Sequence, residues 1–366
     1  MTPRRFVLNI TICVATIASI LVSSLSPGQA QTPQKIRYVI ALPAMFLVTA
    51  NQSSVPEHLG YFKEEGIEVE HVAAGSGGIT AAIQLVASGQ QDVGSGTQSP
   101  LIARAAEGQD LGLTFFYNQI RDFHYVIAVL PDSGITNIQQ LKGKTIGVST
   151  LASEGVVTAK YVARTAGLDP NKDLTFVAIG GGAQALQAIK SGQVAAISNL
   201  ESSFVPMESL GQKFNYLPNP PGTAEVFGPG FFARRDYIDA NKKALIGLGR
   251  AIAKATLFTM TNPEAAVRMH WQKYPEQKPK GATEEQAMKQ ALRVLEVQSK
   301  GFAYRDDEPK LWGNYTAKSW AGYLDIYGVS SKIQDPSRFY TNELIDEINK
   351  FDAQKVIAQA KNFKMP

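Results

Sequence analysis

Four turns in the chain place glycine or hydroxyl side chains directly before a predicted helix. They are 75–78 (Gly-Ser-Gly-Gly), 96–99 (Gly-Thr-Gln-Ser), 149–153 (Ser-Thr-Leu-Ala-Ser) and 180–183 (Gly-Gly-Gly-Ala). A helix N-terminus presents free backbone N–H groups and about half a positive charge. Each turn alone is most simply an ordinary capped helix. Four of them, in two pairs, predict a site for a small ligand with an anionic or hydrogen-bond-accepting group.

The motifs of common catalytic, cofactor and metal sites do not occur. Residues 75–78 lack the third spaced glycine of a dinucleotide fingerprint, and no turn carries the Gly-Lys-Ser/Thr of a phosphate loop. The four histidines lack metal-ligand spacing, and there is no Gly-x-Ser-x-Gly elbow. We therefore expect no catalytic residue, metal or cofactor. Only His58 is close enough to a candidate loop to be considered for ligand contact.

The elements that must position these turns alternate between strands and helices. Such an order predicts α/β architecture with mainly parallel sheets covered on both faces, and with the strand-to-helix turns at one edge. The predicted strands are 35–42, 67–72, 92–94, 125–130, 145–148, 174–179 and 194–198. The predicted helices are 55–65, 79–88, one capped by Ser99, one from the 149–153 turn to 165, 183–190, 242–261, 263–273, 283–300, 315–328 and 342–361.

The first thirty residues have the pattern of an export signal. Arg4 and Arg5 precede an apolar run, and residues 26–30 (Ser-Pro-Gly-Gln-Ala) put small residues at the positions that a signal peptidase requires for cleavage after Ala30. The alternative is an uncleaved anchor, because the apolar run is nearly long enough to span a membrane. Cleavage removes both arginines and the single cysteine, Cys13, and leaves 34 basic and 32 acidic residues.

Composition excludes several classes of protein. With 366 residues, 44% of them hydrophobic and 19% charged, the chain is neither wholly disordered nor a multi-span membrane protein. The near balance of charges argues against a nucleic-acid partner. The length is sufficient for about two domains.

Four segments resemble the substrate-binding proteins of bacterial ABC importers, of the sulfonate/nitrate/taurine and thiamine-pyrimidine-precursor type. They are Leu-Gly-Tyr-Phe-Lys-Glu-Glu-Gly-Ile-Glu-Val at 59–69, Leu-Val-Ala-Ser-Gly-Gln-Gln-Asp-Val-Gly at 85–94, Leu-Lys-Gly-Lys-Thr-Ile-Gly-Val at 141–148 and Ala-Leu-Gln-Ala-Ile-Lys-Ser-Gly-Gln-Val at 185–194. The resemblance implies a type II periplasmic binding protein fold. Its two lobes are joined by two crossovers, expected near 123–129 and 227–234, and close about this hinge. The implied domains are 1–30 (signal peptide), 31–122 (lobe 1, first part), 123–231 (lobe 2) and 232–366 (lobe 1, second part, with the C-terminal helices).

The resemblance also implies where a solute binds, since members of the family hold it between the lobes on loops that follow the strands. The loop after the first strand departs from the family pattern around residues 51–54. The ligand-binding residues expected by position are Thr49, Asn51, Ser76, Gly77, Gly78, Thr97, Gln98, Ser99, Ser149, Thr150, Ser153, Gly181, Gly182, Ala183, Asn199 and Glu201.

The candidate site loops are 46–58, 74–82, 95–101, 147–155, 179–187 and 197–206. These six loops contain no lysine or arginine, but they contain Glu57, Glu154 and Glu201. An anion bound there would depend on dipoles and hydroxyls, although such ligands often recruit a fixed cation. The other interpretation is a neutral or donor-bearing ligand facing Glu154 or Glu201. A third is that these acids are exposed residues at helix starts, where the helix dipole favours them. The pattern favours an organic solute over an inorganic ion.

The function expected is therefore capture of a small organic solute in the periplasm by a monomer that delivers it to a membrane permease. A sensory protein that docks on a membrane receptor would use the same cleft and is the main alternative. An exported enzyme on the same fold is a weaker one, because after signal cleavage the chain has no cysteine.

Overall fold

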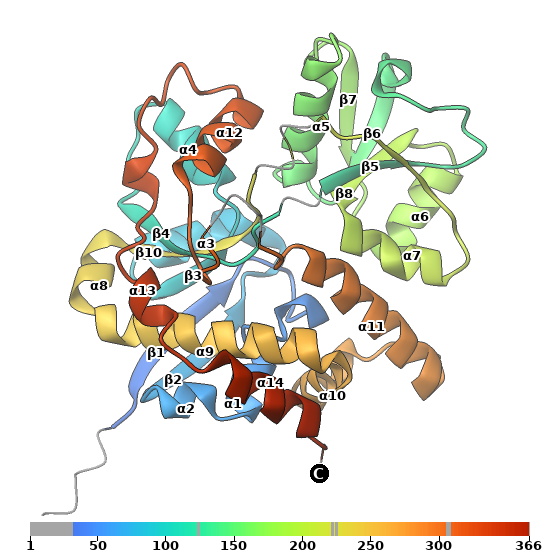
Figure 1. The fold of residues 1–366 in the computed structure, drawn as a ribbon. Coiled ribbons are helices and arrows are strands. Elements are labelled where there is room, and N and C mark those ends of the chain that lie inside the picture. The colour runs from blue at the N-terminus through green and yellow to red at the C-terminus, as the bar shows by residue number, and fades with distance from the viewer. Residues whose placement is uncertain (1–31, 123–124, 221–222, 224–225, 305–308, 366) are drawn as a thin grey trace, which may run out of the picture. The chain divides into compact units, whose positions relative to one another are not determined.

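The computed structural model describes residues 32–122, 125–220, 223, 226–304 and 309–365 (Figure 1). The predicted signal peptide and its cleavage after Ala30 lie outside the described residues. Within those ranges, no helix is both long enough and apolar enough to cross a membrane.

The first sheet has five strands in the order β2-β1-β3-β10-β4. Strand β1 pairs in parallel with β2 and β3, whereas β10 is antiparallel to both β3 and β4. Four strands therefore run in one direction, and only β10 runs against them. The bounds are Gln34–Ile40 (β1), Ile67–Ala73 (β2), Val93–Gly96 (β3), Leu113–Asn118 (β4) and Gly230–Arg234 (β10).

The second sheet repeats this plan in the order β7-β6-β8-β5-β9. Strand β6 is parallel to β7 and β8, and β5 is antiparallel to β8 and β9. Two mainly parallel sheets, as the sequence predicts, are thus confirmed, each with one reversed strand. The bounds are Tyr125–Val129 (β5), Lys144–Val148 (β6), Leu174–Ala178 (β7), Ala196–Leu200 (β8) and Asn215–Leu217 (β9).

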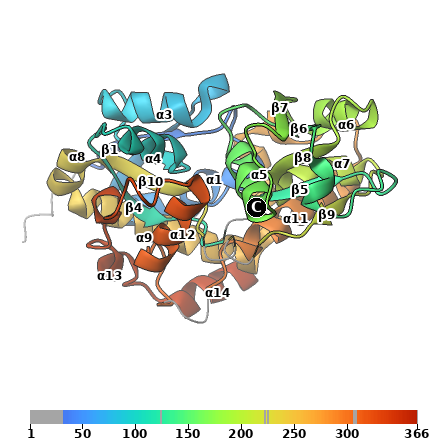
Figure 2. The same cartoon turned by 90° about the horizontal axis from the view of Figure 1, so that it is seen from above.

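Helices cover both sheets (Figures 1 and 2). Around the first sheet they are α1 (Ser54–His58), α2 (Tyr61–Glu64), α3 (Gly78–Ala87), α4 (Ser99–Ala106), α8 (Arg235–Ala240), α9 (Lys242–Thr261), α10 (Pro263–Lys273), α11 (Glu284–Lys300), α12 (Ala317–Tyr327), α13 (Ile345–Ile348) and α14 (Ala353–Asn362). Those next to the second sheet are α5 (Glu154–Thr165), α6 (Gly182–Lys190) and α7 (Val205–Ser209). Short 3-10 turns are η1 (Leu47–Thr49), η2 (Gly75–Gly77), η3 (Ile138–Leu141), η4 (Glu201–Phe204), η6 (Pro275–Gln277) and η7 (Ser337–Phe339).

Alternating side chains give each sheet an apolar core on both faces. Tyr38 belongs to the cluster that contains α9, while the next residue, Val39, belongs to the cluster that contains α12. In the same way, Phe231 and Phe232 of β10 enter opposite clusters. This is the side-chain period of two expected for a strand buried on both sides.

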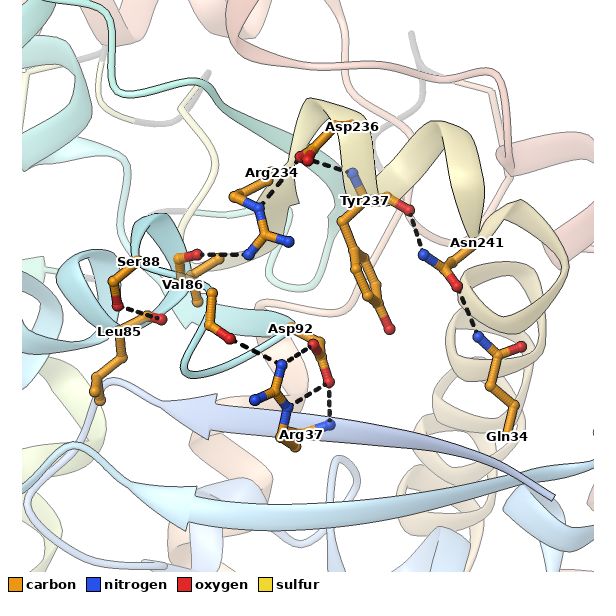
Figure 3. A network of polar contacts seen from close by, with 11 residues as sticks. Gln34, Arg37, Leu85, Val86, Ser88, Asp92, Arg234, Asp236, Tyr237 and Asn241 are labelled. Carbon is orange, nitrogen blue, oxygen red and sulfur yellow. Dashed lines mark hydrogen bonds and ion pairs between the residues drawn. The ribbon is translucent and has the colours of Figure 1, made fainter.

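A polar network holds the end of the first sheet away from the candidate loops (Figure 3). The carboxylate of Asp92 accepts hydrogen bonds from the backbone N–H of Arg37 at 2.9 Å and from its Nε at 3.0 Å. The same guanidinium donates to the carbonyl of Gly89 at 2.9 Å. Arg234 of β10 donates to the carbonyl of Val86 at 3.2 Å. These contacts tie β1 to the segment between α3 and β3, and β10 to the last turn of α3.

Two predicted helices are each two helices in the structure. Residues 55–65 are divided into α1 and α2 at Gly60, whose φ of +74° lies in the left-handed region. Residues 342–361 are divided into α13 and α14. Asn349 accepts a hydrogen bond from the backbone N–H of Trp312 at 2.8 Å, and Asp352 caps α14 by accepting from the backbone N–H of Lys355 at 3.0 Å. Such side-chain bonds to the backbone compete with continuous helix.

Two strands of the first sheet were missed by the sequence analysis. All six residues of β4 are buried, so the segment shows no alternation of polar and apolar residues. Strand β10 falls within 227–234, where a crossover was expected, and its partners in the sheet lie more than a hundred residues earlier. Most of the other expected range, 123–129, is β5 of the second sheet.

The two links between the sheets meet at Ile120 and Gly228. They comprise residues 119–124 and 218–229, of which 123, 124, 221, 222, 224 and 225 lie outside the described residues. The backbone N–H of Gly228 donates to the carbonyl of Ile120 at 2.7 Å, and that of Ile120 donates to the carbonyl of Pro229 at 3.2 Å. The two links are therefore joined to each other by backbone hydrogen bonds.

Candidate functional site

Four helices begin where the sequence places its glycine and hydroxyl turns. Helices α3 and α4 follow β2 and β3, and helices α5 and α6 follow β6 and β7. Because these strands are parallel within each sheet, each pair of helix N-termini lies at the carboxyl edge of its sheet. None of the four has a side-chain hydrogen bond from its N-cap residue, so their first N–H groups are not satisfied in that way.

At the edge of the first sheet, the predicted residues differ in their exposure to solvent. Ser76 and Gly77 are exposed, and Gly78 is half-buried at the start of α3. The hydroxyls of Thr97 and Ser99 lie 3.1 Å apart. Helix α4 begins at Ser99 itself, so Gln98 rather than Ser99 is the N-cap residue.

Gln98 is fully buried and points toward the links between the sheets. Its side-chain amide donates to the carbonyl of Gly228 at 3.2 Å. This residue therefore connects the start of α4 with the paired links rather than with open space.

Thr49 and Asn51, in the loop after β1, are turned into the protein interior. The hydroxyl of Thr49 donates to the carbonyl of Phe46 at 2.8 Å, and the amide of Asn51 donates to the hydroxyl of Thr256 at 2.9 Å. Both residues are buried. Their observed contacts position the loop.

The buried side chain of His270 contacts the same loop at two places. One ring nitrogen of His270 lies 2.8 Å from the carbonyl oxygen of Met45, and the other lies 3.0 Å from the hydroxyl oxygen of Ser54. Burial lowers the pKa of His270 to about 4 and that of His71 to about 3. His58 is exposed on α1 with its ring 6.1 Å from that of Phe363, a contact with the C-terminal end rather than with the helix starts.

At the edge of the second sheet, the predicted residues are more exposed. Ser149 and Ser153 are half-buried and Thr150 is exposed, while Gly181 and Ala183 are exposed and Gly182 is half-buried. The neighbouring Leu151 is 61% exposed, and Phe46 in the loop after β1 is 42% exposed. Each edge therefore presents one large apolar side chain beside its polar loop.

Asn199 and Glu201 follow β8 at that edge. Asn199 is buried, and its side-chain carbonyl accepts a hydrogen bond from the backbone N–H of Leu200 at 2.9 Å. Glu201 is paired with Lys300 of α11 at 3.0 Å. The six loops contain no lysine or arginine, but Lys300 of α11 places its ammonium group beside Glu201.

Glu154 is a buried carboxyl group that joins α5 to α12. It is the first residue of α5, is 2% exposed and accepts a hydrogen bond from the hydroxyl of Tyr323 at 3.0 Å. Tyr327 donates to its other carboxylate oxygen. Burial raises the pKa of Glu154. The interpretation of this residue as an exposed acid at a helix start is therefore wrong.

Sequence reasoning missed Tyr323, Tyr327 and Lys300 as parts of this region. The two tyrosines are four residues apart, which puts both on one face of α12. That spacing is a detectable signal, but nothing in the sequence indicates that the face meets α5. No group of three or more His, Cys, Asp or Glu side chains in the described ranges is arranged to hold a metal ion.

Comparison with known sequences identifies the family to which this chain belongs. The model of the family described as NMT1/THI5 like matches residues 54–266. The chain is also 25% identical over 201 residues to YtlA of Bacillus subtilis (strain 168), whose name proposes that it is a binding protein. That match covers 55% of this chain and spans 60% of the length of YtlA.

Solved structures with the same fold include two sulfonate-binding proteins. The periplasmic aliphatic sulphonate binding protein SsuA of Escherichia coli superposes with a TM-score of 0.62 at 17% identity, covering 89% of this chain and 100% of SsuA. The alkanesulfonate-binding SsuA of Xanthomonas axonopodis pv. citri, bound to MOPS, gives 0.60 at 18% identity over 84% of this chain and 96% of its own. A protein of Bordetella bronchiseptica RB50 gives 0.64 at 21% identity over 90% and 99%. At these identities the likeness establishes the two-lobed fold.

Proposed function

The chain belongs to the NMT1/THI5-like family, and on this premise we propose that it is the solute-binding component of an ABC-type importer. It captures a small organic solute and delivers it to a membrane permease. The observation that carries the proposal is the start of α3, α4, α5 and α6 at the carboxyl edges of two sheets. The fold shared with two sulfonate-binding proteins supports it.

The solute binds between two lobes, which close about the paired links. Lobe 1 comprises 31–122 and 232–366, and lobe 2 comprises 123–231. Rotation about the links brings the helix N-termini of both edges to one ligand. The residues that contact the solute are drawn from Thr49, Asn51, Ser76, Gly77, Gly78, Thr97, Gln98, Ser99, Ser149, Thr150, Ser153, Gly181, Gly182, Ala183, Asn199 and Glu201.

The protein acts in the periplasm as a monomer, after residues 1–30 are cleaved as a signal peptide. Its solute has an apolar body, because Phe46 and Leu151 are exposed beside the polar loops of the two edges. It does not act as an enzyme on this solute.

A ligand screen by thermal unfolding, followed by calorimetry on each hit, tests the proposal. A solute that binds the folded state raises the melting temperature by an amount that grows with its concentration. We expect one small organic compound to do so and to be recovered unchanged. Chemical conversion of every bound compound would contradict the role in transport, and so would the absence of any stabilising compound.

A further inference from the structure

One face of helix α5 contacts α12 of lobe 1 rather than the sheet of lobe 2. Four residues at steps of three and four along α5 share this face. They are Glu154, Val157, Tyr161 and Arg164. Tyr161 and Val157 pack in the apolar cluster that contains α12, whereas Val162 packs in a cluster of the second sheet. Helix α5 therefore has one face for its own sheet and another for lobe 1.

Both ends of this face make polar contacts with α12. Tyr323 donates to one carboxyl oxygen of Glu154 at 3.0 Å, and Tyr327 donates to the other. The guanidinium of Arg164 donates to the carbonyl of Asp325 and to that of the next residue, at 3.0 Å each. An apolar centre between polar ends is typical of a specific interface between two folded units. The two helices lie next to each other in Figure 2.

The contact of α5 with α12 is continuous with the links between the sheets. The ring of Tyr323, whose hydroxyl group donates to Glu154, is stacked on the ring of Phe227 with centroids 5.0 Å apart. Phe227 belongs to the second link and precedes Gly228, whose backbone N–H donates to the carbonyl of Ile120 in the first link at 2.7 Å. A single tyrosine of α12 therefore contacts both a link and α5.

The opposite face of the second sheet makes a weaker contact with lobe 1. Ile127 and Ala128 are neighbours in β5 but pack in the clusters of α5 and of α7, so these helices cover opposite faces. Helix α11 contacts α7 and η4, and its Lys300 is paired with Glu201. These two side chains are 49% and 25% exposed, whereas Glu154 is 2% exposed. Leaving a buried polar group without its partners costs more than separating an exposed pair.

We propose that the contact of α5 with α12 is a fixed pivot, about which lobe 2 rotates while its α7 side moves against α11. Contacts close to a rotation axis change least, so an axis through the links and Tyr323 keeps both in place. The inference rests on the proposed function, because this rotation is the one that captures the solute. Since the pivot forms without a solute, the solute has to stabilise only the contacts on the moving side.

Distances between pairs of spin labels test the pivot in the full chain without any solute. Cys13→Ser removes the single cysteine, so that introduced cysteines are the only labelling sites. One pair spans the pivot, with Thr165→Cys on α5 and Ala321→Cys on α12. The other pair spans the moving side, with Ser209→Cys on α7 and Lys289→Cys on α11. All four positions are exposed, so the labels do not disturb the core.

We expect a narrow distribution of distances across the pivot and a broader one across the moving side. Distributions of equal width would overturn the inference, as would a broader one across the pivot. This comparison does not depend on the folding of any variant that alters the pivot.

The second test removes hydrogen bonds from the pivot. Tyr323→Phe combined with Tyr327→Phe deletes both hydroxyl donors but keeps the rings, including the stack on Phe227. Loss of two hydrogen bonds should raise the population of longer distances across the pivot at least about tenfold. Tyr315→Phe is the matched control, because Tyr315 is buried in the same apolar cluster but its hydroxyl donates to the carbonyl of Tyr117, within lobe 1, at 3.2 Å. It should leave the distances across the pivot unchanged.

The outcomes separate this inference from the proposed function. Unchanged distances in the double variant would refute the pivot, as would an equal change in Tyr315→Phe. If no compound of the ligand screen stabilises the protein, the transport proposal fails, while the distances still test the pivot. If a stabilising compound is found but the two label pairs give distributions of equal width, the transport proposal stands and the pivot is refuted.

Discussion

The ammonium group of Lys300, the last residue of α11, donates a hydrogen bond to the carboxylate of Glu201 at a distance of 3.0 Å. Glu201 directly follows β8 of the second sheet, whereas α11 also contacts the η1 turn after β1 of the first. The side chains of Glu201 and Lys300 are 25% and 49% exposed, so the pair adds little to stability. Its effect is to orient one carboxylate at the edge where the solute is proposed to bind.

Glu201→Gln should weaken solute binding if the solute presents a hydrogen-bond donor to this carboxylate. Loss of a charged acceptor costs about tenfold in affinity or more. Lys300→Met should have a smaller effect, because it removes only the group that orients Glu201. Calorimetry with the solute found in the ligand screen measures both. Unchanged affinity in Glu201→Gln would remove Glu201 from the site.

Gly155→Ala should destabilise the protein, because the added Cβ would lie 2.3 Å from the carbonyl oxygen of Ser198 in β8. That atom is backbone and cannot move aside as a side chain can, so we expect a loss of at least about 2 kcal/mol in urea unfolding. Gly181→Ala, at the start of α6, is the control. A Cβ there meets nothing within 4 Å and φ is −143°, so stability should change by less than about 0.5 kcal/mol. Equal losses would contradict the close contact of α5 with β8.

Asp92→Ala should cost about 1–3 kcal/mol of unfolding free energy, since the backbone N–H and the Nε of Arg37 lose the carboxylate that accepts from them. Glu70→Ala provides the comparison on a neighbouring strand. Its ion pair with Lys35 spans 2.9 Å, but both side chains are more than half exposed. Removing Glu70 should therefore cost less than removing Asp92, because exposed ion pairs add little to stability. Similar costs for the two variants would show that the network in Figure 3 does not stabilise the sheet end.

Acidification should destabilise the protein through its buried histidines. The pKa of His270 is lowered to about 4 in the folded state, mainly by burial, with Lys273 lowering it further and Glu276 and the Met45 carbonyl opposing the shift. The unfolded chain, with an ordinary histidine pKa near 6.5, therefore binds more protons between these two values. The contribution is fully present above about pH 6.5 and is lost as the pH falls. For His270 the loss of unfolding free energy amounts to about 3 kcal/mol by pH 4.

Urea unfolding of wild type and His270→Gln between pH 7 and pH 4 measures this contribution. The variant should show a shallower decline in stability, although His71 still contributes part of the slope. His58→Gln is the comparison variant, because it removes a histidine that is exposed. Parallel curves for wild type and His270→Gln would contradict the prediction.

Local signals in the sequence were sufficient to predict most strands and helices. Gly89 and Gly192 end α3 and α6 as expected, and β-branched runs such as the one in β6 form strands. Two of the misses share a physical cause, which is that the deciding contacts are distant in sequence. Strand β10 exists because it pairs between β3 and β4, and Asn349 ends α13 by bonding to Trp312.

The candidate site was less predictable than the fold. The sequence placed the helix starts correctly, but the environment of each side chain depends on what packs against it. Glu154 is buried only because α12 approaches α5 from more than 150 residues away. Thr49 and Asn51 face inward because Thr256 of α9 and the carbonyl of Phe46 supply their partners.

The chain leaves the first sheet at Asn118 and returns at Gly230, and these two residues are directly opposite each other in the register of β4 and β10. All strands of the second sheet lie between them in the sequence. Topologically, the second sheet is an insertion into the turn of a β-hairpin whose arms are β4 and β10. A tight turn of about two residues could join those arms. Deleting the insert would therefore preserve the strand order of the first sheet. The second sheet is thus a module that is inserted at one point of the β4–β10 hairpin.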